Sequence, residues 1–159
     1  MERLAGYAAT AIGKISIPGA PDWKAIAPDA VWVSNGDMNN VARVDPNTNA
    51  IVATVAVGPR PRCGLAAGFG SVWAPSCGDR RVDRIDQATN RVTTGIATTV
   101  SDSEGGIAAE ATGNDLAGTP ACIDPASNRI VAQVATAPGS FVPAAGAGAL
   151  WVTCRDGIA

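Results

Sequence analysis

The side chains best suited to binding a ligand are four arginines in two short segments. Arg60 and Arg62 lie in a Gly-Pro-Arg-Pro-Arg segment, and Arg80 and Arg81 follow Asp79. Guanidinium groups form paired hydrogen bonds that match carboxylates and phosphates. The two segments therefore predict capture of a small anionic ligand, and the alternative is a solvated charged surface balanced by neighbouring acids.

The sequence offers few residues for catalysis. It contains no histidine, so a Ser-His-Asp triad cannot form, and it has no Gly-x-Ser-x-Gly motif. Asp79, Asp102 and Glu104 could supply paired carboxylates, but their spacing does not bring them together. The four cysteines include no Cys-x-x-Cys pair, so we expect no zinc site and no other cofactor. A non-catalytic role is favoured over an enzyme.

A repeat of about forty residues must position these side chains. The segment at 30–57, AVWVSNGDMNNVARVDPNTNAIVATVAV, returns near residues 71 and 115 and begins again near 149. Trp32 and Trp73 are 41 residues apart, and so are Asp45 and Asp86, whereas Asp124 follows Asp86 after 38 residues. Five residues are missing from the middle of the third copy, so we expect the least regular packing at 116–122.

Four short strands in each copy, with turn residues between them, predict an all-β propeller with four-stranded antiparallel blades. The chain would form a single partial domain over residues 1–159, with about three and a half blades. The expected parts are a blade remnant at 12–17, blades at 23–57, 63–98 and 106–136, and a half blade at 141–154. The expected strands within them are 23–27, 30–34, 40–45, 50–57, 63–67, 71–76, 81–86, 91–98, 106–109, 115–118, 121–124, 129–136 and 151–153.

Several recurring residues fit structural roles. The Asp-Pro-Asn-Thr-Asn segment at 45–49 and its equivalents at 86–90 and 124–128 have turn chemistry, because Asp accepts backbone hydrogen bonds and Asn tolerates a left-handed backbone. We predict turns between the third and fourth strands, not metal loops. The recurring tryptophans are expected to pack between blades and not to form a stacking platform; they are Trp32, Trp73 and Trp151. For Trp23, both core packing and ligand contact remain open.

The midpoint between Cys63 and Cys77 is position 70, which coincides with the Gly68-Phe69-Gly70 turn. Residues placed in this way face each other across a hairpin, so a cross-strand disulfide is predicted, and the alternative is two buried thiols. A lasting disulfide indicates an oxidising compartment. No pairing is predicted for Cys122 or Cys154.

Charge and hydropathy exclude two classes of partner. The formal net charge is −2, from 12 basic and 14 acidic side chains, so there is no basic surplus of the kind that binds nucleic acid. No apolar run approaches the length of about 20 residues that a membrane span needs. Residues 1–13 lack the hydrophobic centre of a signal peptide, so we expect no targeting segment within this sequence.

The motifs VWV, RVDPNTN and PRCGLAAGFGSVWAPSCGD resemble the bacterial YVTN-repeat and virginiamycin B lyase-like propeller superfamily, from Ile12 onward. The resemblance implies a seven-bladed exported propeller about twice this length, and hence a periplasmic or extracellular location. Streptogramin lyases of this superfamily use a catalytic histidine with acidic residues and magnesium. Because this sequence has no histidine, no catalytic residue can be assigned from the resemblance.

In a propeller, the loops between second and third strands and those between blades gather on one rim, where ligands commonly bind. The predicted rim residues are Trp23, Asn35, Asp37, Arg60, Arg62, Asp79, Arg80, Arg81, Asp102, Glu104, Arg155 and Asp156. Three functions follow: a binding or protein-interaction module, an enzyme with catalytic residues partly outside this chain, or a structural subunit of a larger assembly. The expected partners are a small anion and a protein or second copy that completes the ring.

Overall fold

The computed structural model describes residues 1–4, 11–98, 106–108, 121–135, 140–147 and 149–154. Over these ranges the chain is all-β and contains no helix, so none that could cross a membrane. Two complete four-stranded antiparallel sheets lie at its centre, each with its strands in chain order. Their strands are β3 (Pro21–Ala27), β4 (Ala30–Asn35), β5 (Asn40–Asp45) and β6 (Ala50–Ala56), then β7 (Ala66–Gly68), β8 (Ser71–Ser76), β9 (Arg81–Asp86) and β10 (Arg91–Ala97).

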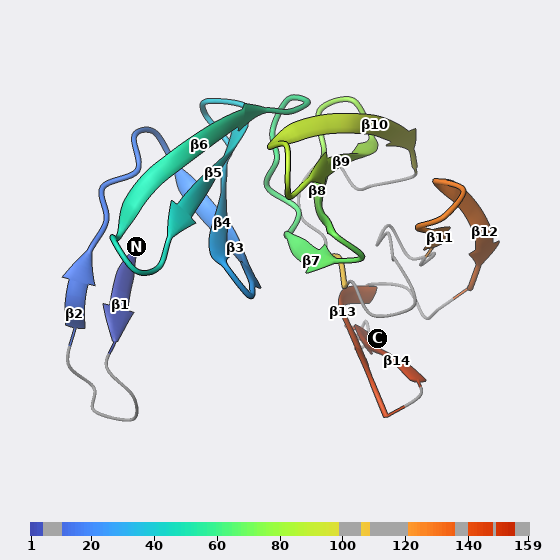
Figure 1. Cartoon of the computed structure of the whole chain (residues 1–159). Coiled ribbons are helices and arrows are strands. Elements are labelled where there is room, and N and C mark those ends of the chain that lie inside the picture. The colour runs from blue at the N-terminus through green and yellow to red at the C-terminus, as the bar shows by residue number, and fades with distance from the viewer. Residues whose placement is uncertain (5–10, 99–105, 109–120, 136–139, 148, 155–159) are drawn as a thin grey trace.

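Within the described part of the chain, three two-stranded antiparallel sheets accompany them. Successive sheets follow one another along an arc, which Figure 1 shows from blue β1 to orange β12, with β13 and β14 below β7. The first strands of the two complete sheets, β3 and β7, contact each other, as do the last strands, β6 and β10. The additional strands are β1 (Glu2–Leu4), β2 (Ala11–Lys14), β11 (Ala121–Asp124), β12 (Arg129–Gln133), β13 (Ser140–Gly146) and β14 (Ala149–Cys154).

The apolar core lies between consecutive sheets. β4 and β8 are buried along almost their whole length, whereas the outer strands β6 and β10 are mostly exposed. This difference explains why the second strands read as nearly continuous apolar runs. One buried cluster joins Trp32 and Val41 of the first complete sheet to Val72 and Ile85 of the second. A second cluster joins the second sheet to Ile123 of β11.

The turns between third and fourth strands have the predicted chemistry. Asp45 accepts hydrogen bonds from the Asn47 amide (2.8 Å) and the Thr48 hydroxyl (3.1 Å). Asn49 closes the turn with a left-handed φ of 57°, and its backbone amide donates a hydrogen bond to the Asp45 carbonyl (2.9 Å). The segments at 86–90 and 124–128 repeat this arrangement.

Several strand limits differ from the sequence expectation. The N-terminal remnant is a hairpin of β1 and β2, whereas the sequence predicted a single strand at 12–17 and no strand at the position of β1. β7 begins at Ala66, not at residue 63, since Gly64 adopts a φ of 94° that interrupts an extended strand. No strand forms at 106–108, whereas β13 and β14 are well-formed longer strands. The irregular segment expected at 116–122 and the strand expected at 115–118 fall mainly outside the described residues.

The recurring tryptophans do not all behave alike. Trp32 and Trp73 are 0% and 4% exposed, as expected for core residues. Trp151 is 63% exposed, so the prediction of core packing is wrong at this position. Among the described strands β14 pairs with β13, whereas β4 and β8 each pair on both sides, and the third strand of those sheets helps to cover the ring.

Candidate functional site

Three loops of the central sheets meet through their backbones. The first is the β4–β5 turn at 36–39, the second is the β6–β7 connection at 57–65, and the third is the β8–β9 turn at 77–80. The Asn39 carbonyl accepts the Val57 amide (3.0 Å), and the Arg60 carbonyl accepts the Cys77 amide (3.1 Å). These bonds place Arg60 and Arg80 on adjoining loops.

Arg60 and Arg80 both adopt left-handed backbone conformations, with φ of 55° and 52°. Asn39, with φ of 51°, occupies in the first complete sheet the turn position of Arg80 in the second. A left-handed φ costs an ordinary residue about 1 kcal/mol, and Asn is among the residues that tolerate it best. Both arginines are exposed, and within the described residues neither guanidinium forms an ion pair.

The neighbouring arginines are neutralised. Arg62 pairs with Asp37 at 2.5 Å, and its side chain lies over Gly36, where an added Cβ would come within 2.1 Å of Arg62 Nε. Arg81 pairs with Asp79 at 3.2 Å and with Asp83 at 2.8 Å. The contact with Asp83 is an ion pair by distance, without the alignment of a hydrogen bond. Of these four arginines, Arg60 and Arg80 therefore form no ion pair with a described residue.

Asp83, which the sequence analysis did not single out, supports this arrangement. Its side chain is 0% exposed and accepts hydrogen bonds from the Gly58 amide (2.7 Å) and the Ser76 hydroxyl (2.9 Å). The carboxylate thereby ties the loop that carries Arg60 to the second complete sheet. A comparison of the repeats could have identified Asp83, because the equivalent strand residue is alanine in the other copies, Ala42 in the first and Ala121 in the third.

Two other predicted rim residues, Asn35 and Trp23, make contacts within the protein that stabilise the fold. Asn35 is 2% exposed, accepts the Ala20 amide (3.1 Å) and donates to the Pro18 carbonyl, so it holds the preceding loop. Trp23 is half-buried and packs against the first core cluster. Its surroundings therefore agree with the core alternative. The remaining predicted rim residues lie outside the described ranges; they are Asp102, Glu104, Arg155 and Asp156.

A disulfide joins Cys63 to Cys77, with both residues buried and their Cα atoms 6.6 Å apart. The hairpin turn contains only Phe69 and Gly70, both with positive φ, and it pairs Gly68 with Ser71. Cys63 therefore precedes the first residue of β7 and has no partner position on β8. The predicted bond is present, but it links the β6–β7 connection to the first residue of the β8–β9 turn and is not a cross-strand pair.

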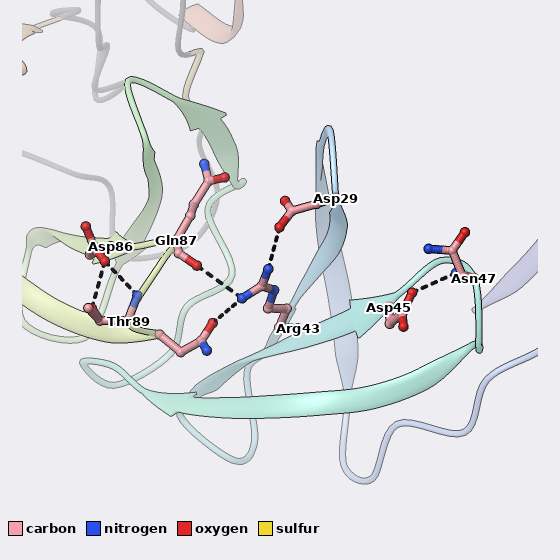
Figure 2. A network of polar contacts seen from close by, with 8 residues as sticks. Asp29, Arg43, Asp45, Asn47, Asp86, Gln87 and Thr89 are labelled. Carbon is pink, nitrogen blue, oxygen red and sulfur yellow. Dashed lines mark hydrogen bonds and ion pairs between the residues drawn. The ribbon is translucent and has the colours of Figure 1, made fainter.

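An arginine contact between consecutive sheets, which the sequence did not reveal, is shown for Arg43 in Figure 2. Its guanidinium lies over the Trp32 ring, 5.5 Å from the centroid. It pairs with Asp29 at 2.6 Å and donates to the Gln87 carbonyl (3.1 Å) and Asn90 Oδ1 (2.9 Å) of the next sheet's turn. The arginine thus connects one sheet to the next.

Arg84 repeats this contact one sheet further along. It lies 4.9 Å from the centroid of the Trp73 ring and donates to the Pro125 carbonyl and Asn128 Oδ1, both at 2.6 Å. In the third copy, Cys122 replaces this arginine, and its thiol is free. Asn90 and Asn128 therefore serve two purposes: each permits a left-handed backbone and accepts a hydrogen bond from the arginine of the preceding sheet.

The acidic turn residues have lowered pKa values for local reasons. Hydrogen bonding to the Thr89 hydroxyl and amide lowers the pKa of Asp86 below 3.8, and the Asn47 amide does the same for Asp45. The Ser127 hydroxyl is the main cause at Asp124. These carboxylates are occupied within their own turns, and no group of three or more His, Cys, Asp or Glu among the described residues could hold a metal ion.

No known protein family and no curated protein sequence matches the chain, but solved structures do. A catalytically inactive virginiamycin B lyase from Staphylococcus aureus with quinupristin is 17% identical, with a TM-score of 0.72 over 87% of this chain and 51% of that one. Hydrazine synthase of Kuenenia stuttgartiensis is 19% identical, with a TM-score of 0.69 over 87% and 42%. BamB from Moraxella catarrhalis is 13% identical, with a TM-score of 0.63 over 86% and 40%.

The chain therefore spans about half or less of the length of these structures. At this level of identity the similarity shows the fold alone, and it agrees with the sequence motifs that predicted a propeller. The chain has the fold of part of a β-propeller of the kind found in virginiamycin B lyase.

Proposed function

We propose that the chain is a non-catalytic binding module of an exported β-propeller, in which Arg60 and Arg80 capture an anionic group. The ligand would carry a carboxylate or phosphate, since guanidinium groups match both. A protein partner or a second copy would complete the ring. The buried Cys63–Cys77 disulfide supports export to the periplasm or beyond, because reducing compartments disfavour such bonds.

One observation carries the proposal: of the four arginines at positions 60, 62, 80 and 81, two are paired with acids and two form no ion pair with a described residue. Arg62 and Arg81 are paired with acids, whereas the exposed guanidinium groups of Arg60 and Arg80 form no ion pair with a described residue. Both arginines also adopt a left-handed backbone conformation, which asparagine would adopt at a lower cost in free energy. Unusual backbone at a surface loop supports a functional role for the side chain.

The test is calorimetric titration of the chain with inorganic phosphate and, separately, with citrate. We expect saturable binding, and an Arg60→Ala plus Arg80→Asn variant should bind at least tenfold more weakly. Asparagine is chosen at position 80 because Asn39 occupies the equivalent turn position with the same sign of φ. The matched control is Arg91→Ala plus Arg129→Ala, which removes two exposed arginines from the outer strands β10 and β12.

Equal binding by wild type and the rim variant, or no saturable binding of either anion, would refute the proposal. Loss of binding in the control as well would show only a net-charge effect and would also count against it. Circular dichroism of each variant checks that the sheets remain folded.

A second candidate is an enzyme whose catalytic residues lie partly outside this chain. The structural similarity to virginiamycin B lyase favours it, although this sequence contributes no histidine. Such an enzyme would turn over a substrate when the full ring is assembled, and the rim variant would lower its rate. A binding module would lose affinity without any turnover to lose.

A further inference from the structure

Asn35 and Gly36 form the one Asn-Gly pair in the sequence, at the end of β4. In such a pair the glycine backbone nitrogen attacks the asparagine Cγ readily, because glycine has no side chain that hinders the approach. A Cγ–N bond forms, the Cγ–Nδ2 bond breaks, and the side-chain amide leaves as ammonia with the proton of the glycine amide. Water then opens the resulting succinimide ring, and the product is aspartate or isoaspartate.

The fold holds the Asn35 side chain in contacts that oppose this reaction. Asn35 is 2% exposed, and its Oδ1 accepts the Ala20 amide at 3.1 Å and the Met38 amide at 3.3 Å. Its Nδ2 donates to the Pro18 carbonyl. The side-chain amide is thus bonded both to the connection that precedes β3 and to the β4–β5 turn. It cannot turn toward the Gly36 nitrogen without breaking these bonds.

The attacking nitrogen is also held in place. The Gly36 amide donates to the Ala20 carbonyl at 3.2 Å. The Arg62 side chain lies over Gly36 and forms an ion pair with Asp37, the next residue of the turn. Attack on Asn35 therefore requires the β4–β5 turn to separate from the connection before β3 and from Arg62.

The second complete sheet has an equivalent turn without this chemistry. Ser76 and Cys77 occupy the positions of Asn35 and Gly36. The Cys77 amide donates to the Arg60 carbonyl at 3.1 Å, as the Gly36 amide does to its neighbouring loop. The backbone contact between the loops therefore does not require an Asn-Gly pair, and serine is the replacement at position 35 that the repeat itself supplies.

We propose that Asn35 is a latent deamidation site, which the fold keeps closed and which reacts when the β4–β5 turn opens. Aspartate here would place a carboxylate against the Pro18 carbonyl, where Nδ2 now donates, and isoaspartate would lengthen the main chain of the turn. Either product opposes closure of the turn. The turn also carries Asn39, whose Oδ1 accepts the Arg60 amide at 3.0 Å, so the reaction makes a local opening between the loops permanent.

This inference does not rest on the anion-binding role. The chain is incubated at mildly alkaline pH, either folded or unfolded in guanidinium chloride, and peptide mapping by mass spectrometry measures deamidation at Asn35. The folded chain should react about a hundredfold more slowly, because several hydrogen bonds must break first. Asn47 is the internal control, since it is exposed and followed by the branched Thr48, and it should react slowly in both states. Equal rates at Asn35 in both states would overturn the proposal.

Two variants connect the reaction to the turn. Arg62→Ala uncovers Gly36 and should raise the rate in the folded chain about threefold to fivefold, as expected for loss of a partly exposed ion pair. Arg129→Ala, on the outer strand β12, should leave it unchanged. An equal rate in Arg62→Ala and Arg129→Ala would contradict the proposal.

Refolding tests the consequence of the reaction. After incubation in denaturant, wild type should lose refolding yield in proportion to the fraction deamidated at Asn35, whereas Asn35→Ser should keep the yield it had before incubation. An equal loss in Asn35→Ser, or full refolding of deamidated wild type, would overturn the proposal. The peptide-mapping comparison decides the case if the serine variant does not fold.

Discussion

Removal of the Arg84 guanidinium should show how much the contact between consecutive sheets contributes to the free energy of unfolding. This side chain stacks on Trp73 and donates to two acceptors on the 124–128 turn, the Pro125 carbonyl and Asn128 Oδ1. Its Nε also donates to Ser71 Oγ at 2.8 Å. Arg84→Ala removes all four contacts and uncovers one face of a buried ring.

The cost can be worked from these contacts. The ring contact contributes about 1 kcal/mol, and hydrogen bonds from a charged donor contribute about 1.5–3 kcal/mol when buried, less when partly exposed as here. We therefore expect Arg84→Ala to lower the free energy of unfolding by about 3 kcal/mol. Arg84→Lys keeps the charge but loses the planar fork, so it should cost about 2 kcal/mol. Arg84→Cys, which imitates Cys122 of the third copy, should resemble alanine.

Urea unfolding followed by tryptophan fluorescence measures these differences. Arg91→Ala is the matched control, because Arg91 is exposed at the start of β10, and its loss should change stability by less than about 0.5 kcal/mol. Asn128→Gly removes one acceptor while permitting the left-handed φ of 56°. Combined with Arg84→Ala, it should show a coupling energy of about 1 kcal/mol.

A loss of stability in Arg84→Ala no larger than that in Arg91→Ala would refute a stabilising contact between the sheets. Strict additivity of the Arg84 and Asn128 changes would also refute it, because the contact would then contribute nothing measurable.

Three further predictions concern the turns and the rim. Because hydrogen bonds in the fold lower the pKa of Asp86 below 3.8, the unfolded chain binds more protons at acidic pH, so stability should fall as pH drops through about 4 and below; Asp86→Asn should flatten that part of a pH–stability curve. Gly58→Ala should destabilise by about 1–3 kcal/mol in urea unfolding, since its Cβ would lie 2.7 Å from Ser76 Cβ; unchanged stability would contradict the packing. Replacing Cys63 and Cys77 together by serine should cost about 3 kcal/mol, and the chain-entropy reasoning is wrong if thermal melting does not shift.

Much of the fold could be predicted because its signals are local. The spacing of Trp32 and Trp73, and the Asp-to-Asn turns beginning at Asp45 and Asp86, mark the sheets without knowledge of distant contacts. The observed strand limits differ from the predicted ones where the backbone conformation could not be inferred from the sequence pattern. Gly64 delayed the start of β7 in this way.

The candidate site could be predicted only in part. The sequence pointed to the loops that carry Arg60 and Arg80, because turn residues and arginines cluster there. It could not separate these arginines from Arg62, whose partner Asp37 is 25 residues away in another loop. It also gave no weight to Asp83, whose role depends on an amide 25 residues earlier in the chain.

The sequence by itself determined the repeat, the strand order within each blade and the turn chemistry, because these depend on residues within a few positions of one another. Only the tertiary structure decided which arginines are neutralised, that Arg43 and Arg84 connect consecutive sheets, and that Trp151 is exposed while Trp32 is buried. Those outcomes depend on loops and strands from separate repeats meeting in space, and equivalent residues acquire different surroundings wherever a neighbouring strand or sheet differs.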